Sequence, residues 1–307
     1  MDPGQFALYR KLTGHTGAVY CMSPGLEPGT LLSAGGDGRI CCWRPEKSED
    51  AKVVAETGER IFAMRVVPQH ELIAAATMSG DLLFLRPGEP VPARKMRVHR
   101  KAAFSLLEIG GSLVAAGSDG LLSVWDPATG NALQLLQCTQ HRLRAAAYCE
   151  QQGVLLLGDH TGALMRMEWP AGKPERLEGR HASTIFCILP DPASGRIVSG
   201  GLDAQLVVSR GFDSDGVRIP AHRFCIHAIS DLRGTPWVAT ASRDRTVRLW
   251  DRNDFRLAGE ISQPNFVAHN HSVNALWWDE DRRRLFTAGD DRQVLVWNFK
   301  QKHDTER

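Results

Sequence analysis

The chain has 307 residues, of which 43% are hydrophobic and 23% charged, as in an ordinary globular protein. Its net charge of +2 is too small to favour nucleic acid as the main partner. The seven cysteines lack CxxC spacing, and the chain has neither an apolar signal segment at its start nor an apolar run long enough to span a membrane. We therefore expect reduced thiols, no membrane partner and a cytoplasmic location.

Taken in chain order, the sequence repeats one pattern seven times. A turn position recurs at Asp37, Ser79, Asp119, Thr161, Asp203, Asp244 and Asp291. The intervals are 42, 40, 42, 42, 41 and 47 residues, which is the period of four-stranded propeller blades. Each unit contains short alternating apolar runs separated by turns, and helical periodicity is nowhere sustained.

The repeats predict an all-β fold, a seven-bladed β-propeller with four antiparallel strands in each blade. We expect a single domain over residues 1–307, with blades at approximately 13–54, 55–96, 97–138, 139–178, 179–219, 220–266 and 267–299. The last unit ends after its third strand, and residues 6–12 have the pattern of a fourth strand. We expect this N-terminal strand to close the last blade, which removes edges that would otherwise aggregate.

Three further positions accompany the turn aspartate: a His about 22 residues before it, a Ser or Thr four before it and a Trp six after it. A buried indole N–H requires an acceptor, and a hydroxyl can accept this bond and donate onward. A His can continue the chain, and the turn Asp can end it as an acceptor. Three units contain all four residues. They are His15, Ser33, Asp37 and Trp43; His222, Thr240, Asp244 and Trp250; and His269, Thr287, Asp291 and Trp297.

This arrangement resembles the Asp–His–Ser/Thr–Trp tetrad of the WD40 (WD-repeat) family, and the resemblance covers nearly the whole chain. The short chain is also similar to stand-alone WD-repeat proteins of bacterial type. The tetrad is incomplete elsewhere: Ala115 occupies the hydroxyl position of unit 3, and Ser209 the Trp position of unit 5. Unit 4 retains only His141, and unit 2 has none of the four residues.

The resemblance implies that three positions in each blade line the top rim of the central channel. These are the residues three and five after the His position and the residue before the turn aspartate. From these positions we select the partner-binding candidates Tyr20, Arg60, Phe62, Phe104, Arg144, His160, Phe186, His227, Arg243, Asn274 and Asp290. Aromatic and Arg side chains are typical of recognition hot spots, so we expect protein or peptide partners that are acidic or contain aromatic residues. The alternative is that the aromatic side chains fold over the channel mouth and only plug it.

Other motifs are weaker. His269 and His271 form an HxH pair that could ligate zinc, but His269 already belongs to a tetrad. The DSDG stretch at 213–216 lacks the Gly and Glu of a calcium loop, and a hairpin turn accounts for it. The longer connection at 262–266 either reaches a ligand or is a neutral insertion.

No nucleophile motif or isolated carboxylate pair occurs in the sequence. We therefore predict a monomeric, non-catalytic interaction scaffold without catalytic residues, metal or cofactor. An RNA- or ribonucleoprotein-associated propeller, using the basic runs at 94–101 or 281–284, is the alternative. An enzyme or ligand-binding propeller is the third possibility.

Overall fold

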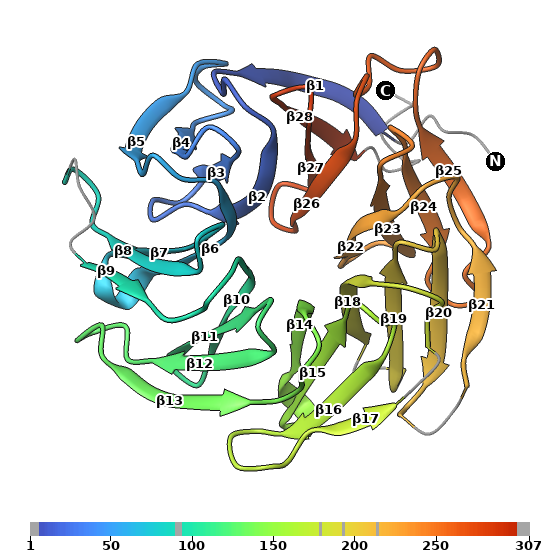
Figure 1. Ribbon diagram of the computed structural model, residues 1–307. Coiled ribbons are helices and arrows are strands. Elements are labelled where there is room, and N and C mark those ends of the chain that lie inside the picture. Colours follow the sequence, from blue (N-terminus) through green and yellow to red (C-terminus); the bar gives the residue numbers. More distant parts are fainter. Residues whose placement is uncertain (1–5, 90–93, 178–179, 192–193, 213–214, 300–307) are drawn as a thin grey trace.

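The computed structural model describes residues 6–89, 94–177, 180–191, 194–212 and 215–299. The strands in these ranges form seven sheets of four antiparallel strands, and the sheets stand around a central axis with one strand of each nearest to it (Figure 1). The predicted seven-bladed propeller is therefore confirmed.

The blades follow the chain, and each is given from its innermost to its outermost strand. Blade 1 contains β2 (Val19–Pro24), β3 (Leu31–Gly35), β4 (Arg39–Trp43) and β5 (Lys52–Glu56). Blade 2 contains β6 (Ile61–Val67), β7 (Leu72–Thr77), β8 (Asp81–Leu85) and β9 (Arg94–Arg97). Blade 3 contains β10 (Ala103–Ile109), β11 (Ser112–Gly117), β12 (Leu121–Trp125) and β13 (Ala132–Gln137). Blade 4 contains β14 (Leu143–Cys149), β15 (Val154–Asp159), β16 (Leu164–Glu168) and β17 (Glu175–Leu177).

The second half of the ring repeats this order. Blade 5 contains β18 (Ile185–Asp191), β19 (Arg196–Gly201), β20 (Gln205–Arg210) and β21 (Val217–Pro220). Blade 6 contains β22 (Ile226–Leu232), β23 (Trp237–Ser242), β24 (Val247–Asp251) and β25 (Leu257–Ile261). Blade 7 contains β26 (Val273–Asp279), β27 (Arg284–Gly289), β28 (Gln293–Phe299) and β1 (Phe6–Thr13). Two short 3₁₀ helices, η2 (Pro68–His70) and η3 (Glu150–Gln152), connect the first two strands of blades 2 and 4.

The two middle strands of a blade are apolar along most of their length because neighbouring blades cover both of their faces. In blade 2, β7 has the sequence LIAAAT and β8 the sequence DLLFL, and every residue of both strands is buried. The outermost strand faces solvent instead, and all four residues of β9 are exposed. The core thus lies between adjacent sheets, where apolar side chains of both blades are removed from water.

The N-terminal strand closes the ring as predicted. β1 pairs antiparallel with β28, with Phe6 opposite Phe299 and Leu12 opposite Val294 (Figure 1). Leu12 is fully buried, and the Phe6 ring lies 5.4 Å from Phe299 between centroids. The last blade is therefore held together by hydrogen bonds and apolar contacts between residues from the two ends of the described chain.

Every innermost strand begins with a β-bulge. The register of the innermost pair skips one residue at the same place in each blade. The skipped residues are Tyr20, Phe62, Phe104, Arg144, Phe186, His227 and Asn274. A bulge changes the direction in which the side chain of its extra residue points. These seven side chains therefore do not follow the regular alternation of their strands. We refer to them as the bulge ring.

Candidate functional site

The top end of each blade is defined by the turn between its second and third strands and by the loop that enters its first strand. The residue before the turn-aspartate position donates its backbone N–H to a carbonyl in the entry loop of the same blade. In blade 1 this bond joins Gly36 N to Ala18 O at 2.7 Å, and in blade 7 it joins Asp290 N to Ser272 O at 2.9 Å. The predicted rim positions of one blade are thus tied to one another by a backbone bond.

In blades 1, 6 and 7 the tetrad residues form an unbroken chain of hydrogen bonds. In blade 1, Trp43 Nε1 donates to Ser33 Oγ at 2.7 Å, and His15 Nε2 lies 2.7 Å from the same hydroxyl. His15 Nδ1 lies 2.9 Å from Asp37 Oδ2. A carboxylate only accepts, so Nδ1 carries the proton and Nε2 accepts from the hydroxyl. The same chain joins the tetrads of blades 6 and 7: His222, Thr240, Asp244 and Trp250, and His269, Thr287, Asp291 and Trp297.

The tetrad carboxylates are fully engaged. Burial opposes ionisation of Asp244, but hydrogen bonds from His222, Thr246 and the Arg223 backbone N–H outweigh it and hold the pKa of Asp244 well below its ordinary value. Burial likewise opposes ionisation of Asp37, and bonds from the Arg39 N–H and His15 lower its pKa. These acids are occupied within their own blades, which leaves their charge little available to a partner.

Two blades replace the tetrad with a buried acid paired to an outer-strand cation. In blade 2, the side chain of Asp81 is fully buried and lies 2.9 Å from Arg97 Nε and 3.0 Å from Lys95 Nζ. In blade 4, Asp159 is equally buried and pairs with Arg176. The cations come from β9 and β17, so the outermost strand is tied inward by an ion pair where the indole is missing.

Blade 3 keeps three tetrad residues and rearranges their bonds. His99 Nδ1 lies 3.0 Å from Asp119 Oδ1, and His99 Nε2 lies 3.1 Å from Ser123 Oγ on β12. Ala115 has no hydroxyl, and the buried Trp125 Nε1 has no hydrogen-bond partner among the described residues. This blade therefore contains an unpaired buried donor, which is energetically unfavourable.

The structure moves the His position of blade 4 by two residues. The Thr139 backbone N–H donates to Gly120 O, as His99 N donates to Gly80 O one blade earlier. Thr139, and not His141, therefore occupies this position. The residue five positions later is accordingly Arg144 rather than Ala146. Arg144, which the sequence placed three positions after the His position, therefore belongs to the bulge ring.

The side chains of the bulge ring contact one another from blade to blade. Tyr20 stacks on Phe62 with centroids 5.3 Å apart, and Phe62 lies 5.0 Å from Phe104. Phe186 continues the series to His227 at 5.5 Å. All seven members remain half-buried: Tyr20, Phe62, Phe104, Arg144, Phe186, His227 and Asn274. The ring therefore borders the channel mouth while keeping surface that a partner can contact.

Arg144 connects the two aromatic groups of the ring. Its Cζ lies 3.5 Å from the Phe104 ring centroid and 5.0 Å from that of Phe186, which is cation–π geometry. Its Nε is buried without a hydrogen-bond partner among the described residues. Burial, and secondarily the charge of Arg142, lower the pKa of Arg144 to about 10, so the guanidinium stays protonated at neutral pH. The channel mouth thus presents a cation held by aromatic faces and paired with no described acid.

The opposite side of the ring is polar. Asn274 Nδ2 donates to Asp290 Oδ1 at 2.7 Å and to Val19 O of blade 1 at 3.1 Å. Burial lowers the pKa of His227 to about 4, with Asp290 opposing and Arg144 reinforcing the shift, so His227 is neutral at neutral pH. Asp290 is the acid of this site, and Asn274 already binds it.

Three remaining candidates lie around the bulge ring rather than in it. Arg60 and Arg243 are exposed, and neither forms an ion pair with a described residue. His160 is half-buried, accepts the Arg142 backbone N–H at 3.2 Å and lies 5.5 Å from the His141 ring. Arg60 and Arg243 therefore add free positive charge to the rim.

The longer connection at 262–266 packs its aromatic residue partly against blade 7. Phe266 is half-buried and lies edge-to-face on Trp297, with centroids 6.0 Å apart. Pro264 and Val267 are exposed beside it, Val267 with 67% of its surface accessible. Whether this connection reaches a ligand therefore stays a prediction, with Pro264 and Val267 exposed and Phe266 partly so.

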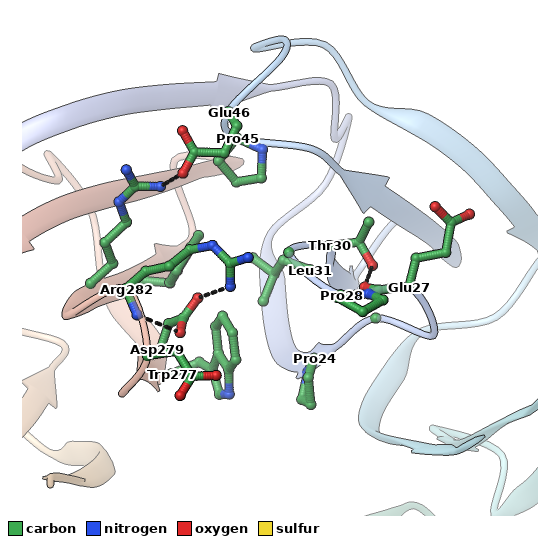
Figure 2. Close-up of a pocket in the computed structure, with 15 residues that line it drawn as sticks. Pro24, Glu27, Pro28, Thr30, Leu31, Pro45, Glu46, Trp277, Asp279 and Arg282 are labelled. Carbon is green, nitrogen blue, oxygen red and sulfur yellow. Dashed lines mark hydrogen bonds and ion pairs between the residues drawn. The ribbon is translucent and has the colours of Figure 1, made fainter. Parts of the chain in front are cut away.

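At the other end of the propeller, a pocket of about 230 Å³ lies between blades 7 and 1 (Figure 2). Trp277 packs on Phe286 on one side, and the turn around Thr30 forms the other. Two of its acids already have partners: Asp279 accepts from Arg282 at 3.3 Å, and Glu46 pairs with Arg284. The sequence pattern did not indicate this pocket, because its walls come from opposite ends of the chain.

Two classes of feature are absent from the part of the chain that the structure describes. No three His, Cys, Asp or Glu side chains cluster as metal ligands would. No helix there is long and apolar enough to cross a membrane. Residues 213 and 214 of the DSDG stretch lie outside the described residues.

Comparison with known proteins identifies the repeats. The model of the family "WD domain, G-beta repeat" (WD40) matches residues 6–44, 216–251 and 262–298, the stretches that carry the three complete tetrads. Target of rapamycin complex subunit LST8 of Mus musculus is 24% identical over 271 residues, covering 82% of each chain. WD repeat-containing protein 37 of Mus musculus is 24% identical over 306 residues, covering 94% of this chain and 59% of that relative.

A solved structure has the same architecture. The WD40 β-propeller domain of Doa1 superposes with a TM-score of 0.82, with 98% of this chain and 99% of that chain covered. Its sequence identity is 16%, so this likeness concerns the fold alone. The matched repeats, the WD-repeat relatives and the seven blades agree. Three stretches of the chain are therefore similar to WD40 repeats, and its described strands form a seven-bladed propeller.

Proposed function

We propose that this protein is a non-catalytic interaction scaffold that binds protein or peptide partners, acidic ones in particular, at the top end of its propeller. It would act without a cofactor, as a monomer in the cytoplasm. The observation that carries the proposal is the position of Arg144. This half-buried cation lies between the rings of Phe104 and Phe186 and forms no ion pair with a described acid.

Charge and exposure at the same end support this proposal. Arg60 and Arg243 are exposed and without ion pairs among the described residues, whereas Asp290 is bound by Asn274 and the tetrad acids by His and backbone N–H groups. An acidic partner would find unpaired guanidinium groups next to aromatic surface, the combination that dominates interface energetics. LST8, a relative, is by its name a subunit of a complex, which agrees with a role in assembly.

Lateral packing of the aromatic rings also supports the alternative that they only plug the channel. The two roles predict different results when the charge of an exposed arginine at the top end is reversed: a binding surface loses partners, whereas a plug does not. The test compares Arg60→Glu with Arg86→Glu, two exposed arginines at opposite ends of blade 2 without ion pairs among the described residues. Each variant is crosslinked in host lysate, and the captured proteins are quantified by mass spectrometry.

We expect Arg60→Glu to lose partners that the wild type and Arg86→Glu retain, with the same melting temperature for all three proteins. Equal capture by the two variants would contradict binding at the top end. An RNA-associated propeller would instead lose its captured material on nuclease treatment.

A further inference from the structure

The outermost strand of blade 3 is an open sheet edge. β13 lies on the outside of the ring, and five of its six residues are exposed (Figure 1). It pairs with β12 on one side and, within the described residues, with no strand on the other. Such an edge presents unpaired backbone N–H and C=O groups, to which another extended segment can bind.

The other outermost strands carry residues that discourage such pairing. Lys, Arg, Glu or Pro occurs in each of β1, β5, β9, β17, β21 and β25. β13 has the sequence ALQLLQ, without charge or proline, and its six residues exceed the three to five of β5, β9, β17, β21 and β25. Its bulge at Leu133 is shared with β5 and β25. Of the seven outermost strands that the structure describes, β13 is therefore the least protected against strand addition.

The hydrogen-bond pattern determines which backbone groups of β13 face outward. Directly after this strand, Cys138 N donates to Gly120 O at 3.0 Å. In an antiparallel pair, residues that exchange both backbone bonds with the residue opposite alternate with residues that exchange neither. Counting back from Cys138, Leu136 faces β12, whereas Gln137 and Leu135 direct their N–H and C=O groups away from it. The free edge therefore offers donors and acceptors spaced for an extended backbone.

Apolar side chains accompany this edge. Leu133 and Leu135 are 58% and 55% exposed. Leu135 lies opposite Ser123, on the face of blade 3 that packs against blade 2. Met96 of β9 is 37% exposed and lies opposite Leu82, which belongs to the core between these two blades. A strand added to β13 would therefore cover apolar surface that the propeller itself leaves open to water.

One cation at the end of β13 away from the top of the propeller has no acid. Arg94 is exposed, its side chain passes over Gly130, and its Nη1 lies 3.5 Å from Asn131 Oδ1. It forms no ion pair with a described residue. A second copy paired antiparallel along β13 would bring residues 137–142 (QCTQHR) to this end, and they contain no acid. The charge therefore favours a segment of another protein that carries Asp or Glu here.

We propose that β13 binds an extended segment of a partner protein as a fifth strand of blade 3. The segment has apolar residues at alternate positions and an acidic residue beside Arg94. Backbone bonds to Leu135 and Gln137 supply affinity, and the exposed leucines select apolar side chains. This surface lies on the side of the ring, apart from the bulge ring, so the inference does not depend on binding at the top end.

The test uses a synthetic peptide of alternating Val and Thr with two Asp at one end. Control peptides replace both Asp by Asn, or the central Val by Pro, which removes a ladder donor. The proteins are wild type, Leu135→Lys, Leu257→Lys and Arg94→Glu. Leu257 is the matched control because it is 48% exposed on β25, an outermost strand that already carries Glu260. Amide hydrogen exchange, resolved by residue with NMR, reports binding.

At about 1 mM peptide, we expect the Leu135 amide of the wild type to exchange about tenfold more slowly, with little change at Leu136. Leu257→Lys should keep this protection within about twofold. Leu135→Lys should lose most of it, because a lysine on the edge opposes strand addition, while its melting temperature stays within about 2 °C of the wild type. The wild type should bind the Asp peptide about threefold more tightly than the Asn peptide, and Arg94→Glu should lose this preference.

Unchanged exchange at Leu135, equal protection in the two Lys variants, or equal binding of the Pro peptide would overturn the inference. An undiminished preference of Arg94→Glu for the Asp peptide would overturn the assignment of an acidic segment. Sedimentation of the protein alone tests the other occupant: a dimer that Leu135→Lys dissociates would assign the edge to a second copy and overturn the inference as well. Because Arg60→Glu and Arg86→Glu test the top end separately, failure at β13 leaves the proposed function standing.

Discussion

Ala115→Thr should repair the incomplete tetrad of blade 3. Ala115 is fully buried and pairs in register with Ser123, as Ser33 pairs with Cys41 in blade 1. At this strand position the hydroxyls of blades 1, 6 and 7 accept the indole N–H at 2.7, 2.8 and 3.1 Å. A threonine hydroxyl at position 115 therefore lies within reach of the unpaired Trp125 Nε1.

The magnitude follows from comparing two isosteric variants. Ala115→Thr and Ala115→Val add nearly the same volume to a packed site, so they share the overpacking cost. Only Thr supplies an acceptor to a buried donor that otherwise has none. We expect Ala115→Thr to exceed Ala115→Val in the free energy of unfolding by about 1–2 kcal/mol. At this chain length, that difference corresponds to about 1.5–3 °C in the melting temperature.

Differential scanning calorimetry measures both variants, alone and combined with Trp125→Phe. The phenylalanine has no N–H, so the difference between Thr and Val should shrink in that background. A Thr variant that melts at or below the Val variant would refute the reasoning. So would a difference of the same size with and without the Trp125 N–H.

Three further predictions concern stability. Deleting residues 1–12 should lower the melting temperature or cause aggregation, because it removes β1 and exposes the edge of β28; an unchanged melting temperature would contradict this role. Thr287→Val should lower the free energy of unfolding by about 2–4 kcal/mol by unpairing Trp297 Nε1 and His269 Nε2, whereas a calorimetric change below about 1 kcal/mol would mean that the tetrad contributes little. Although burial would raise it, bonds from Arg97, Lys95 and Ser79 lower the pKa of Asp81 to about 2. The resulting stability is present above the unfolded pKa of about 4 and lost as the pH falls toward 2, so the melting temperature should fall over this range and fall less in Asp81→Asn. Equal pH profiles would exclude Asp81 as a contributor.

Much of the fold follows from local, periodic signals. The recurrence of about 42 residues predicted the number of blades, and the incomplete last unit predicted closure by the N-terminal strand. Tetrad spacing is also local, because the strands it joins are consecutive hairpins. His15, Ser33 and Asp37, which lie within 22 residues, are therefore hydrogen-bonded where the spacing suggested.

Contacts between blades depend instead on the tertiary structure. In blade 4 the spacing suggested Ala146 as the residue five positions after the His position, but the bulge register selects Arg144, because this two-residue shift has no signature in composition. The packing of Phe62 between Tyr20 and Phe104 joins residues about one repeat apart. No short-range pattern encodes which charges remain unpaired once seven sheets converge. The position of the Arg144 guanidinium between Phe104 and Phe186 of the two neighbouring blades therefore emerges only when the blades are assembled.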